Sequence, residues 1–249
     1  MLHCEKWGKG DPVVLVHGFT QTGRSWGDLG RRLGAIHAVN AVDAPGHGGS
    51  GHIAAGLWDG AALIGEAGGT ATYVGYSMGG RFALHLALRR PDLATRLVLI
   101  STSAGIDDAA ERAERLVADE ALARKIEREG VEAFVGWWLR RPMWATLPEE
   151  AAGIGQRLSN SAAGLASSLR LAGAGRIDPP LWGRLGELAM PVLILAGELD
   201  SAYAGRAARF GAAIRRATVA IVPGAGHACH LERPDAVWEI VEPWLATEP

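Results

Sequence analysis

The sequence is poor in cysteine, and it has no long apolar run. The two cysteines, Cys4 and Cys229, lie far apart and form no C-x-x-C motif, which argues against a disulfide framework and against a zinc site. No stretch approaches the roughly 18 apolar residues that a membrane-spanning helix needs, and residues 1–12 lack a signal-peptide pattern. We therefore expect a cytoplasmic, soluble chain without a membrane span.

An excess of charge of one sign is also lacking. The 25 basic and 27 acidic residues give a formal net charge of −2, which is not typical of a nucleic-acid-binding protein. Only Lys6, Lys9 and Lys125 are lysines, so 22 of the basic residues are arginines. GC-rich coding explains most of this bias, and the 34 glycines fit the same cause. Some of the arginines could instead bind carboxylates, because a planar guanidinium matches a carboxylate better than an ammonium does.

Short apolar runs bounded by turn residues alternate with helical stretches over much of the chain. With 249 residues, 48% of them hydrophobic, the chain can bury a sizeable core. The runs lack the alternation of a half-exposed sheet, so they predict buried parallel strands covered by helices on both faces. The six runs are 13–16, 39–42, 72–75, 97–100, 192–195 and 219–222.

This alternation stops between residues 100 and 192. Residues 107–129 are highly charged and helical in pattern, and they are followed by several aromatic residues and by small-residue helices through Gly173. A strand rhythm that pauses for helices and then resumes predicts an inserted helical lid. We expect core segments 1–104 and 186–249, lid residues 105–185, and chemistry at the carboxyl ends of the parallel strands.

A G-x-S-x-G motif surrounds Ser77. The motif is weak in a glycine-rich chain, but here a strand precedes it and a helix follows, as in a nucleophile elbow. A serine nucleophile needs a base and an orienting carboxylate. Asp200 and His227 each follow a predicted strand, so Ser77, Asp200 and His227 are the expected catalytic triad. Glu198 as the orienting group and His230 as the base are less favoured alternatives.

Two further loops follow predicted strands. In this architecture the backbone amides of Phe19, after the first central strand, and of Met78 would form an oxyanion hole. Residues 46–51 satisfy G-x-G-x-x-G, but Pro45 precedes them and no strand follows before Glu66, so we reject a dinucleotide site. The segment resembles a structural turn instead. We expect no metal and no organic cofactor.

These motifs together resemble the α/β-hydrolase superfamily over essentially the whole chain, with its mostly parallel sheet and inserted lid. Additional motifs resemble the 2-succinyl-6-hydroxy-2,4-cyclohexadiene-1-carboxylate synthases of menaquinone biosynthesis. They are Arg81 one helical turn after Ser77, Ala113-Glu114-Arg115, Trp137-Trp138, Arg157-x-x-Asn160 and Gly226-His227-x-x-His230-x-Glu232-x-Pro234.

The resemblance implies a lyase that eliminates pyruvate from 2-succinyl-5-enolpyruvyl-6-hydroxy-3-cyclohexene-1-carboxylate. By this resemblance, Ser77 and His227 of this chain would remove the proton that starts the elimination. The reaction would need no added water and no acyl-enzyme. The partner would be a small polycarboxylate. Substrate carboxylates would bind to three arginines, and two aromatic residues would line the pocket; these are Arg81, Arg115, Arg157, Tyr76 and Trp138.

The chain departs from the family pattern at two places. Ser201-Ala202-Tyr203, after the predicted triad aspartate, keeps the usual aromatic residue but lacks the usual lysine, and Trp138 stands where some members have tyrosine. Two alternatives therefore stay open. One is a serine hydrolase of small esters or of carbon–carbon bonds in ring-cleavage products, and the other is a non-catalytic ligand-binding relative. The sequence does not indicate an oligomeric state.

Overall fold

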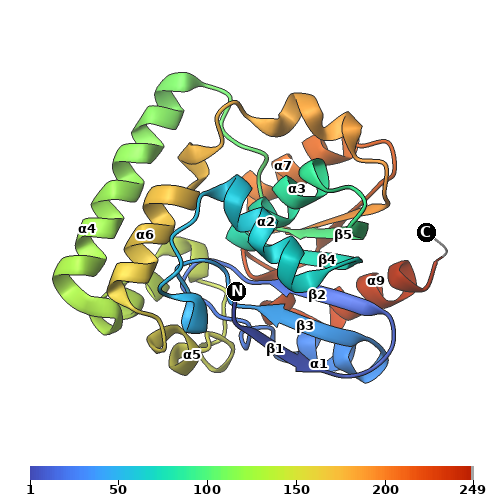
Figure 1. Ribbon diagram of the computed structural model, residues 1–249, viewed down its shortest axis with the longest axis horizontal. Coiled ribbons are helices and arrows are strands. Elements are labelled where there is room, and N and C mark those ends of the chain that lie inside the picture. The colour runs from blue at the N-terminus through green and yellow to red at the C-terminus, as the bar shows by residue number, and fades with distance from the viewer. Residues whose placement is uncertain (248–249) are drawn as a thin grey trace.

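The computed structural model describes residues 1–247 and contains a seven-stranded sheet (Figure 1). The strand order is β1-β3-β2-β4-β5-β6-β7, with β1 antiparallel to β3 and all other neighbours parallel. The six predicted runs all lie within β2–β7. The strands are β1 (Cys4–Trp7), β2 (Pro12–Val16), β3 (Ala38–Val42), β4 (Ala71–Tyr76), β5 (Ala94–Ile100), β6 (Val192–Gly197) and β7 (Ala217–Val222).

The two edge strands differ from the sequence prediction. No strand was expected over β1, because it contains charged residues and has no apolar run. β7 was expected to be buried on both faces, but Val219 and Ile221 are 39% and 40% exposed. That expectation is wrong because β7 is the last strand of the sheet and has a neighbouring strand on one side only.

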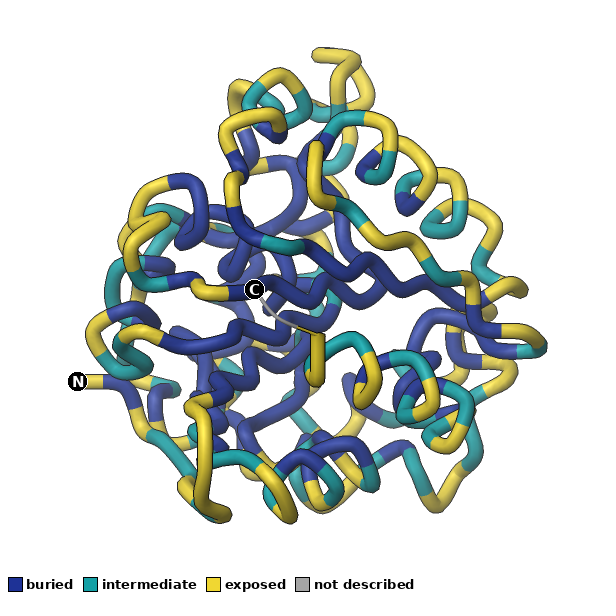
Figure 2. Tube along the Cα trace, turned by 90° about the vertical axis from the view of Figure 1, so that its right-hand side faces the viewer, coloured by how far each residue is buried: buried dark blue, intermediate teal, exposed yellow. Residues whose placement is uncertain are grey.

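Helices cover both faces of the sheet, as predicted. On one face the core cluster includes Ile64, Phe82 and Phe210, and on the other it includes Leu33 and Val241. Figure 2 shows the buried strands running through the interior between more exposed helices. The helices are α2 (Leu57–Gly68), α3 (Met78–Arg89) and α7 (Ser201–Ala213) on the first face, and α1 (Gly27–Ile36) and α9 (Pro234–Ala246) on the second.

The segment between β5 and β6 forms a helical layer with a small core of its own. α4 (Ala109–Leu139) packs beside α6 (Ala162–Ala172), with the short α5 (Ile154–Leu158) between them in sequence (Figure 1). α4 bends at Gly130, whose φ of 79° is unfavourable for other residues. Ile126, Phe134 and Leu165 are buried in a separate apolar cluster within this helical layer. That residues 105–185 act as a lid, between core segments 1–104 and 186–249, stays a prediction.

Short helical turns complete the described part of the chain. They are α8 (Cys229–Glu232) and the 3-10 turns η1 (Gly48–Ser50), η2 (Pro142–Trp144), η3 (Glu149–Ala151), η4 (Ala174–Arg176) and η5 (Leu181–Glu187). Among residues 1–247, no helix has both the length and the apolar character needed to cross a bilayer.

Candidate active site

Ser77 occupies a sharp turn between β4 and α3. Its φ of 51° lies in the left-handed region, which costs a non-glycine residue about 1–3 kcal/mol. Small neighbours permit the turn, because a Cβ on Gly79 would overlap the carbonyl oxygen of Val16 and one on Gly75 would collide with the backbone of α3. The Ser77 amide also donates to Ile100 O at 2.8 Å. The turn therefore holds the serine at the carboxyl edge of the sheet.

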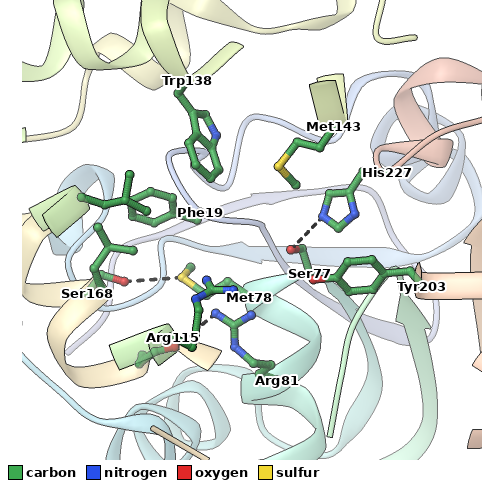
Figure 3. Close-up of a pocket in the computed structure, with 14 residues that line it drawn as sticks. Phe19, Ser77, Met78, Arg81, Arg115, Trp138, Met143, Ser168, Tyr203 and His227 are labelled. Carbon is green, nitrogen blue, oxygen red and sulfur yellow. Dashed lines mark hydrogen bonds between the residues drawn. The ribbon is translucent and has the colours of Figure 1, made fainter. Parts of the chain in front are cut away.

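Asp200 and His227 meet Ser77 at this edge. His227 Nδ1 lies 2.7 Å from Asp200 Oδ2. On its other side, His227 Nε2 lies 3.1 Å from Ser77 Oγ, as Figure 3 shows for these two residues. A carboxylate only accepts hydrogen bonds, so it assigns the ring proton to Nδ1 and leaves Nε2 free to accept the serine proton. The structure thus brings the three predicted residues together in the order that proton transfer needs. Their catalytic role stays a prediction.

The two alternative groups lie elsewhere. Glu198 Oε2 accepts a hydrogen bond from the Gly224 amide at 2.8 Å. His230 is buried, and its ring lies 4.4 Å from that of Tyr76 and 5.3 Å from that of Trp26. Burial lowers the pKa of His230 to about 3, so this ring is neutral. The geometry favours neither residue as part of the triad.

Glu232 holds the loop that carries the histidine of the candidate triad. Its buried carboxylate accepts from the Gly226 amide at 2.6 Å and from the Ala228 amide at 2.9 Å, one on each side of His227. Sequence reasoning assigned no role to Glu232. Its position five residues after the predicted base was the available signal.

The predicted oxyanion-hole residues lie beside Ser77. Phe19 and Met78 both line the cavity next to the serine. Within the described residues, neither backbone N–H donates a hydrogen bond to another protein group. Both amides are therefore available to a ligand oxygen. Their part in stabilising an oxyanion stays a prediction.

A cavity of about 110 Å³ opens beside Ser77 (Figure 3). Arg81, Arg115 and Trp138 line it, as the resemblance implied. Sequence reasoning did not assign the other lining residues, most of which come from the helical layer. Their orientation depends on tertiary packing, so only Tyr203, three residues after the predicted aspartate, had a local signal. The unassigned residues are Leu122, Met143, Ser168, Leu169, Ala172, Gly173 and Tyr203.

Among the described residues, two arginines and no acidic side chain line the cavity. Arg81 is 8% exposed and donates to Ala172 O at 3.2 Å, while its Nε is buried without a partner among residues 1–247. Burial lowers the pKa of Arg81 to about 10, and the charge of Arg115 contributes to the lowering. Arg115 Nε donates to Asp119 Oδ1 at 2.8 Å. This arrangement is net positive and suits an anionic ligand.

Trp138, which also lines the cavity, has a donor left unpaired by residues 1–247. Its indole N–H is buried and lacks a hydrogen-bond partner within the described part of the chain. A buried donor of this kind is costly unless a ligand accepts from it. The tryptophan that replaces a tyrosine of some relatives thus still offers one hydrogen bond.

Two residues predicted to bind substrate do not line the cavity. Tyr76 ends β4, and its side chain packs in the core cluster on the α1 and α9 face, because successive strand residues point to opposite faces. Arg157 is fully buried, and α5 directs its side chain to the loop around Thr20. Its Nε donates to Ala152 O at 2.7 Å, and its Nη1 contacts Thr20 Oγ1. The expected pocket positions of Tyr76 and Arg157 are therefore corrected.

The G-x-G-x-x-G segment is held by the protein's own acceptors. The Gly46 amide donates to Ser50 O, the Gly48 amide to Asn160 Oδ1 and the Gly49 amide to Asp43 Oδ2, at 3.2, 2.8 and 2.8 Å. These amides are not free to bind a phosphate. The segment is a structural turn. Among residues 1–247, no group of three or more His, Cys, Asp or Glu side chains could hold a metal ion.

The chain is similar to known proteins over most of its length. Residues 13–240 match the alpha/beta hydrolase family. The chain belongs to this family. The α/β-hydrolase fold predicted from the sequence is therefore confirmed, and the triad candidates occupy its strand ends.

Relatives within the alpha/beta hydrolase family support the closer resemblance. A protein of Bacillus subtilis (strain 168) is 34% identical, over 95% of this chain and 91% of its own length. A 2-succinyl-6-hydroxy-2,4-cyclohexadiene-1-carboxylate synthase of Escherichia coli O1:K1 / APEC is 31% identical, over 95% and 96%. The structure of MenH from S. aureus is 30% identical and superposes with a TM-score of 0.89 over 98% of each chain. The predicted resemblance to the synthases is confirmed.

Proposed function

We propose that this chain is a lyase that converts 2-succinyl-5-enolpyruvyl-6-hydroxy-3-cyclohexene-1-carboxylate to 2-succinyl-6-hydroxy-2,4-cyclohexadiene-1-carboxylate and pyruvate. The observation that carries the proposal is the net positive arginine pair beside a serine that is hydrogen-bonded to a histidine. The substrate has three carboxylates, so it matches a wall with more guanidinium than carboxylate groups. The similarity to the E. coli synthase supports the same assignment.

The proposed reaction begins with proton transfer at the triad. His227 Nε2 accepts the Ser77 hydroxyl proton, and Ser77 Oγ removes the proton from the ring carbon next to the succinyl carbonyl. The electron pair moves onto the carbonyl oxygen as an enolate. When it returns, the ring double bond shifts and the C–O bond to the enolpyruvyl group breaks. The enolpyruvate accepts the proton held on His227 Nε2 and becomes pyruvate, while Ser77 keeps the proton from the ring carbon; the triad is restored and no water is consumed.

Groups around the triad would stabilise the charges of this reaction. The Phe19 and Met78 amides would donate to the enolate oxygen, a type of contact whose loss costs other enzymes about 10²–10³-fold in rate. Arg81 and Arg115 would bind substrate carboxylates, and the free Trp138 N–H would donate to another substrate oxygen. All these groups belong to this chain's side chains and backbone.

We also propose that the enzyme is cytoplasmic and that residues 105–185 act as a lid over its active site. The cavity of about 110 Å³ is smaller than the roughly 300 Å³ at the low end for small-molecule pockets. Met143, at the cavity mouth, and α4 would have to move outward to admit a substrate with three carboxylates. Their return would enclose the reacting groups.

The test separates this lyase from a serine hydrolase that uses the same triad. Purified protein is given the enolpyruvyl substrate, with pyruvate followed by coupled reduction, and separately p-nitrophenyl acetate. We expect stoichiometric pyruvate release that Ser77→Ala abolishes, with slow ester turnover. Thr70→Ala, which removes an exposed hydroxyl outside the cavity, is the control. Rapid ester turnover without pyruvate release would instead support the hydrolase.

A further inference from the structure

Thr20 has an unfavourable backbone conformation next to a predicted oxyanion-hole residue. Its φ of 67° lies in the left-handed region, which a β-branched residue rarely adopts. Thr20 directly follows Phe19, whose amide faces the proposed enolate. A strained residue persists when its surroundings hold it, and such residues concentrate at functional sites. What holds Thr20 therefore bears on the position of the Phe19 amide.

Two of the groups that hold Thr20 come from the helical layer. Asn160 Nδ2 donates to Thr20 O at 2.7 Å, and Arg157 donates to Thr20 Oγ1. From the core, His47 Nε2 accepts from the Thr20 amide at 3.3 Å. Asn160 Oδ1 also accepts from the Gly48 amide, so the same side chain joins two loops of the core.

Arg157 has the contacts of a residue that supports the loop. It is fully buried, it has no carboxylate partner among residues 1–247, and its acceptors are Ala152 O, Phe19 O at 3.5 Å and Thr20 Oγ1. Burying a guanidinium without a carboxylate is unfavourable. The hydrogen bonds of Nε and Nη1 go to protein acceptors, two of them on residues 19–20, while Nη2 is buried without a partner among residues 1–247.

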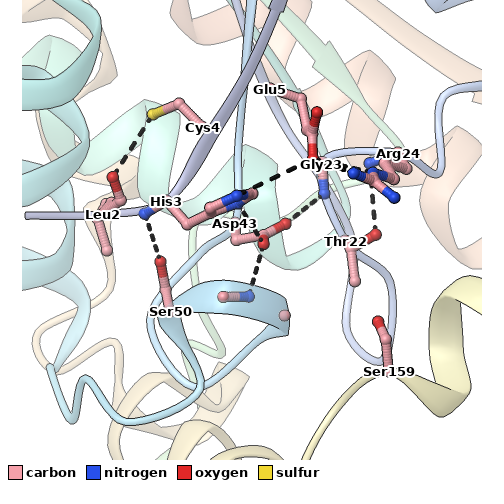
Figure 4. A network of polar contacts seen from close by, with 12 residues as sticks. Leu2, His3, Cys4, Glu5, Thr22, Gly23, Arg24, Asp43, Ser50 and Ser159 are labelled. Carbon is pink, nitrogen blue, oxygen red and sulfur yellow. Dashed lines mark hydrogen bonds and ion pairs between the residues drawn. The ribbon is translucent and has the colours of Figure 1, made fainter.

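One end of the same loop is held by the core. Asp43 Oδ1 accepts from the Gly23 amide at 2.7 Å, and Asp43 Oδ2 accepts from the Gly49 amide (Figure 4). Gln21 Oε1 accepts from the Gly18 amide at 3.0 Å. Asp43 of the core therefore fixes the Gly23 end of the loop, and the strained centre is held jointly by His47 of the core and by two side chains of the helical layer.

We propose that Arg157 and Asn160 are positioning residues through which the helical layer keeps Thr20 in its left-handed conformation and the Phe19 amide directed into the cavity. Arg157 acts on the reaction through this loop and does not bind a substrate carboxylate. The inference rests on the proposed function in one respect, namely that the Phe19 amide stabilises the enolate. It follows that the oxyanion site is complete only while residues 157–160 are docked on the core.

The test uses Arg157→Met and Asn160→Ala with two readouts. One is kcat and KM for pyruvate release. The other is the rate at which Ser77 reacts with uncharged diisopropyl fluorophosphate: Ser77 Oγ bonds to phosphorus, fluoride leaves and His227 receives the serine proton. Because an oxyanion donor is misplaced and not removed, we expect kcat and the labelling rate to fall together by about 10–100-fold. KM should stay within about threefold, as expected when a transition-state interaction is lost.

Two comparison variants separate positioning from direct binding and from general damage. Arg215→Met, at an exposed arginine that does not line the cavity, should change neither readout. Arg81→Met should raise KM for the tricarboxylate, as loss of a carboxylate contact does. Circular dichroism checks that each variant folds. If Arg157→Met does not fold, Asn160→Ala decides, because it removes only one amide group.

Several results would overturn the inference. Arg157→Met with a raised KM and an unchanged labelling rate would make this arginine a carboxylate ligand. Unchanged labelling in Asn160→Ala would show that the loop does not need the layer. Absence of Ser77 labelling in the unmodified chain would contradict the triad chemistry and this inference with it. Labelling without pyruvate release would contradict only the lyase assignment, and the comparison of labelling rates would still decide the positioning role.

Discussion

Replacing Arg81 with methionine should stabilise the protein while it removes most of the activity. The guanidinium is 8% exposed, donates one hydrogen bond to Ala172 O and leaves its Nε without a partner in the described chain. Burial lowers its pKa to about 10, which corresponds to about 3 kcal/mol against the charged form. Methionine fills similar space without charge, and the lost hydrogen bond costs about 1 kcal/mol.

The net effect of Arg81→Met is therefore a gain of about 2 kcal/mol in the free energy of unfolding. For a chain of this size, about 2–4 °C per kcal/mol gives a rise in Tm of about 4–8 °C. In the complex the same change removes a buried charge contact, which costs about 2–5 kcal/mol. We expect kcat/KM for pyruvate release to fall by about 30- to 4,000-fold, at 1.4 kcal/mol per tenfold.

Thermal melts followed by circular dichroism and the coupled pyruvate assay measure the two effects. Arg115→Met is the matched control, because Arg115 is partly exposed and pairs with the buried carboxylate of Asp119. Its loss leaves that carboxylate without a cation, so this variant should melt at a lower temperature. The reasoning is refuted if Arg81→Met melts several degrees below the unmodified chain and keeps near-normal kcat/KM. Arg81 would then be a structural residue.

Two further predictions concern other buried groups. Burial lowers the pKa of His47 and of His230 to about 3 and that of His85 to about 4, below the ordinary value of about 6.5. Below pH 6.5 the folded state then binds fewer protons than the unfolded state. The free energy of unfolding is therefore unaffected above about pH 6.5 and falls as the pH is lowered from about 6.5 to 3. At pH 5 the loss is up to about 2 kcal/mol per histidine. Melts between pH 5 and 7.5 check this, and a Tm independent of pH would contradict it. Glu232→Gln should lower Tm by several degrees and kcat by about tenfold. The reason is that one of the two loop amides then faces the glutamine NH2 group and loses its acceptor. An unaltered kcat would show that the loop does not depend on this carboxylate.

The features predicted correctly from the sequence are those encoded by local pattern. The strands β2–β6 each contain a short, mostly apolar run, and the turn at Ser77 needs small neighbours that the sequence displays directly. Asp200 and His227 could be placed because parallel strands bring their carboxyl ends to one edge. The 2.7 Å contact between Asp200 Oδ2 and His227 Nδ1 follows from the sheet topology more than from any sequence motif.

The features that were missed depend on how elements rotate against one another. Arg157 lies on the helical layer, as expected, but local sequence does not determine which way a five-residue helix turns its arginine. Tyr76 precedes Ser77 in the motif, and strand alternation alone could have placed its side chain on the opposite face. β1 gave no signal because it has only four residues, two of them charged, and it pairs with β3 at the edge of the sheet.

The division of labour between core and helical layer explains how one triad can serve different reactions. The core supplies Ser77, Asp200 and His227, whose geometry suits ester hydrolysis and elimination equally. The helical layer supplies Arg115 and Trp138 to the cavity wall and, in our proposal, the contacts that hold the Phe19 amide. Because substrate anions and the oxyanion loop both depend on this layer, its docking couples binding of a polycarboxylate to assembly of the catalytic site. Under the proposed function, the choice of reaction would lie in the inserted helices together with Arg81 of core helix α3, and not in the triad.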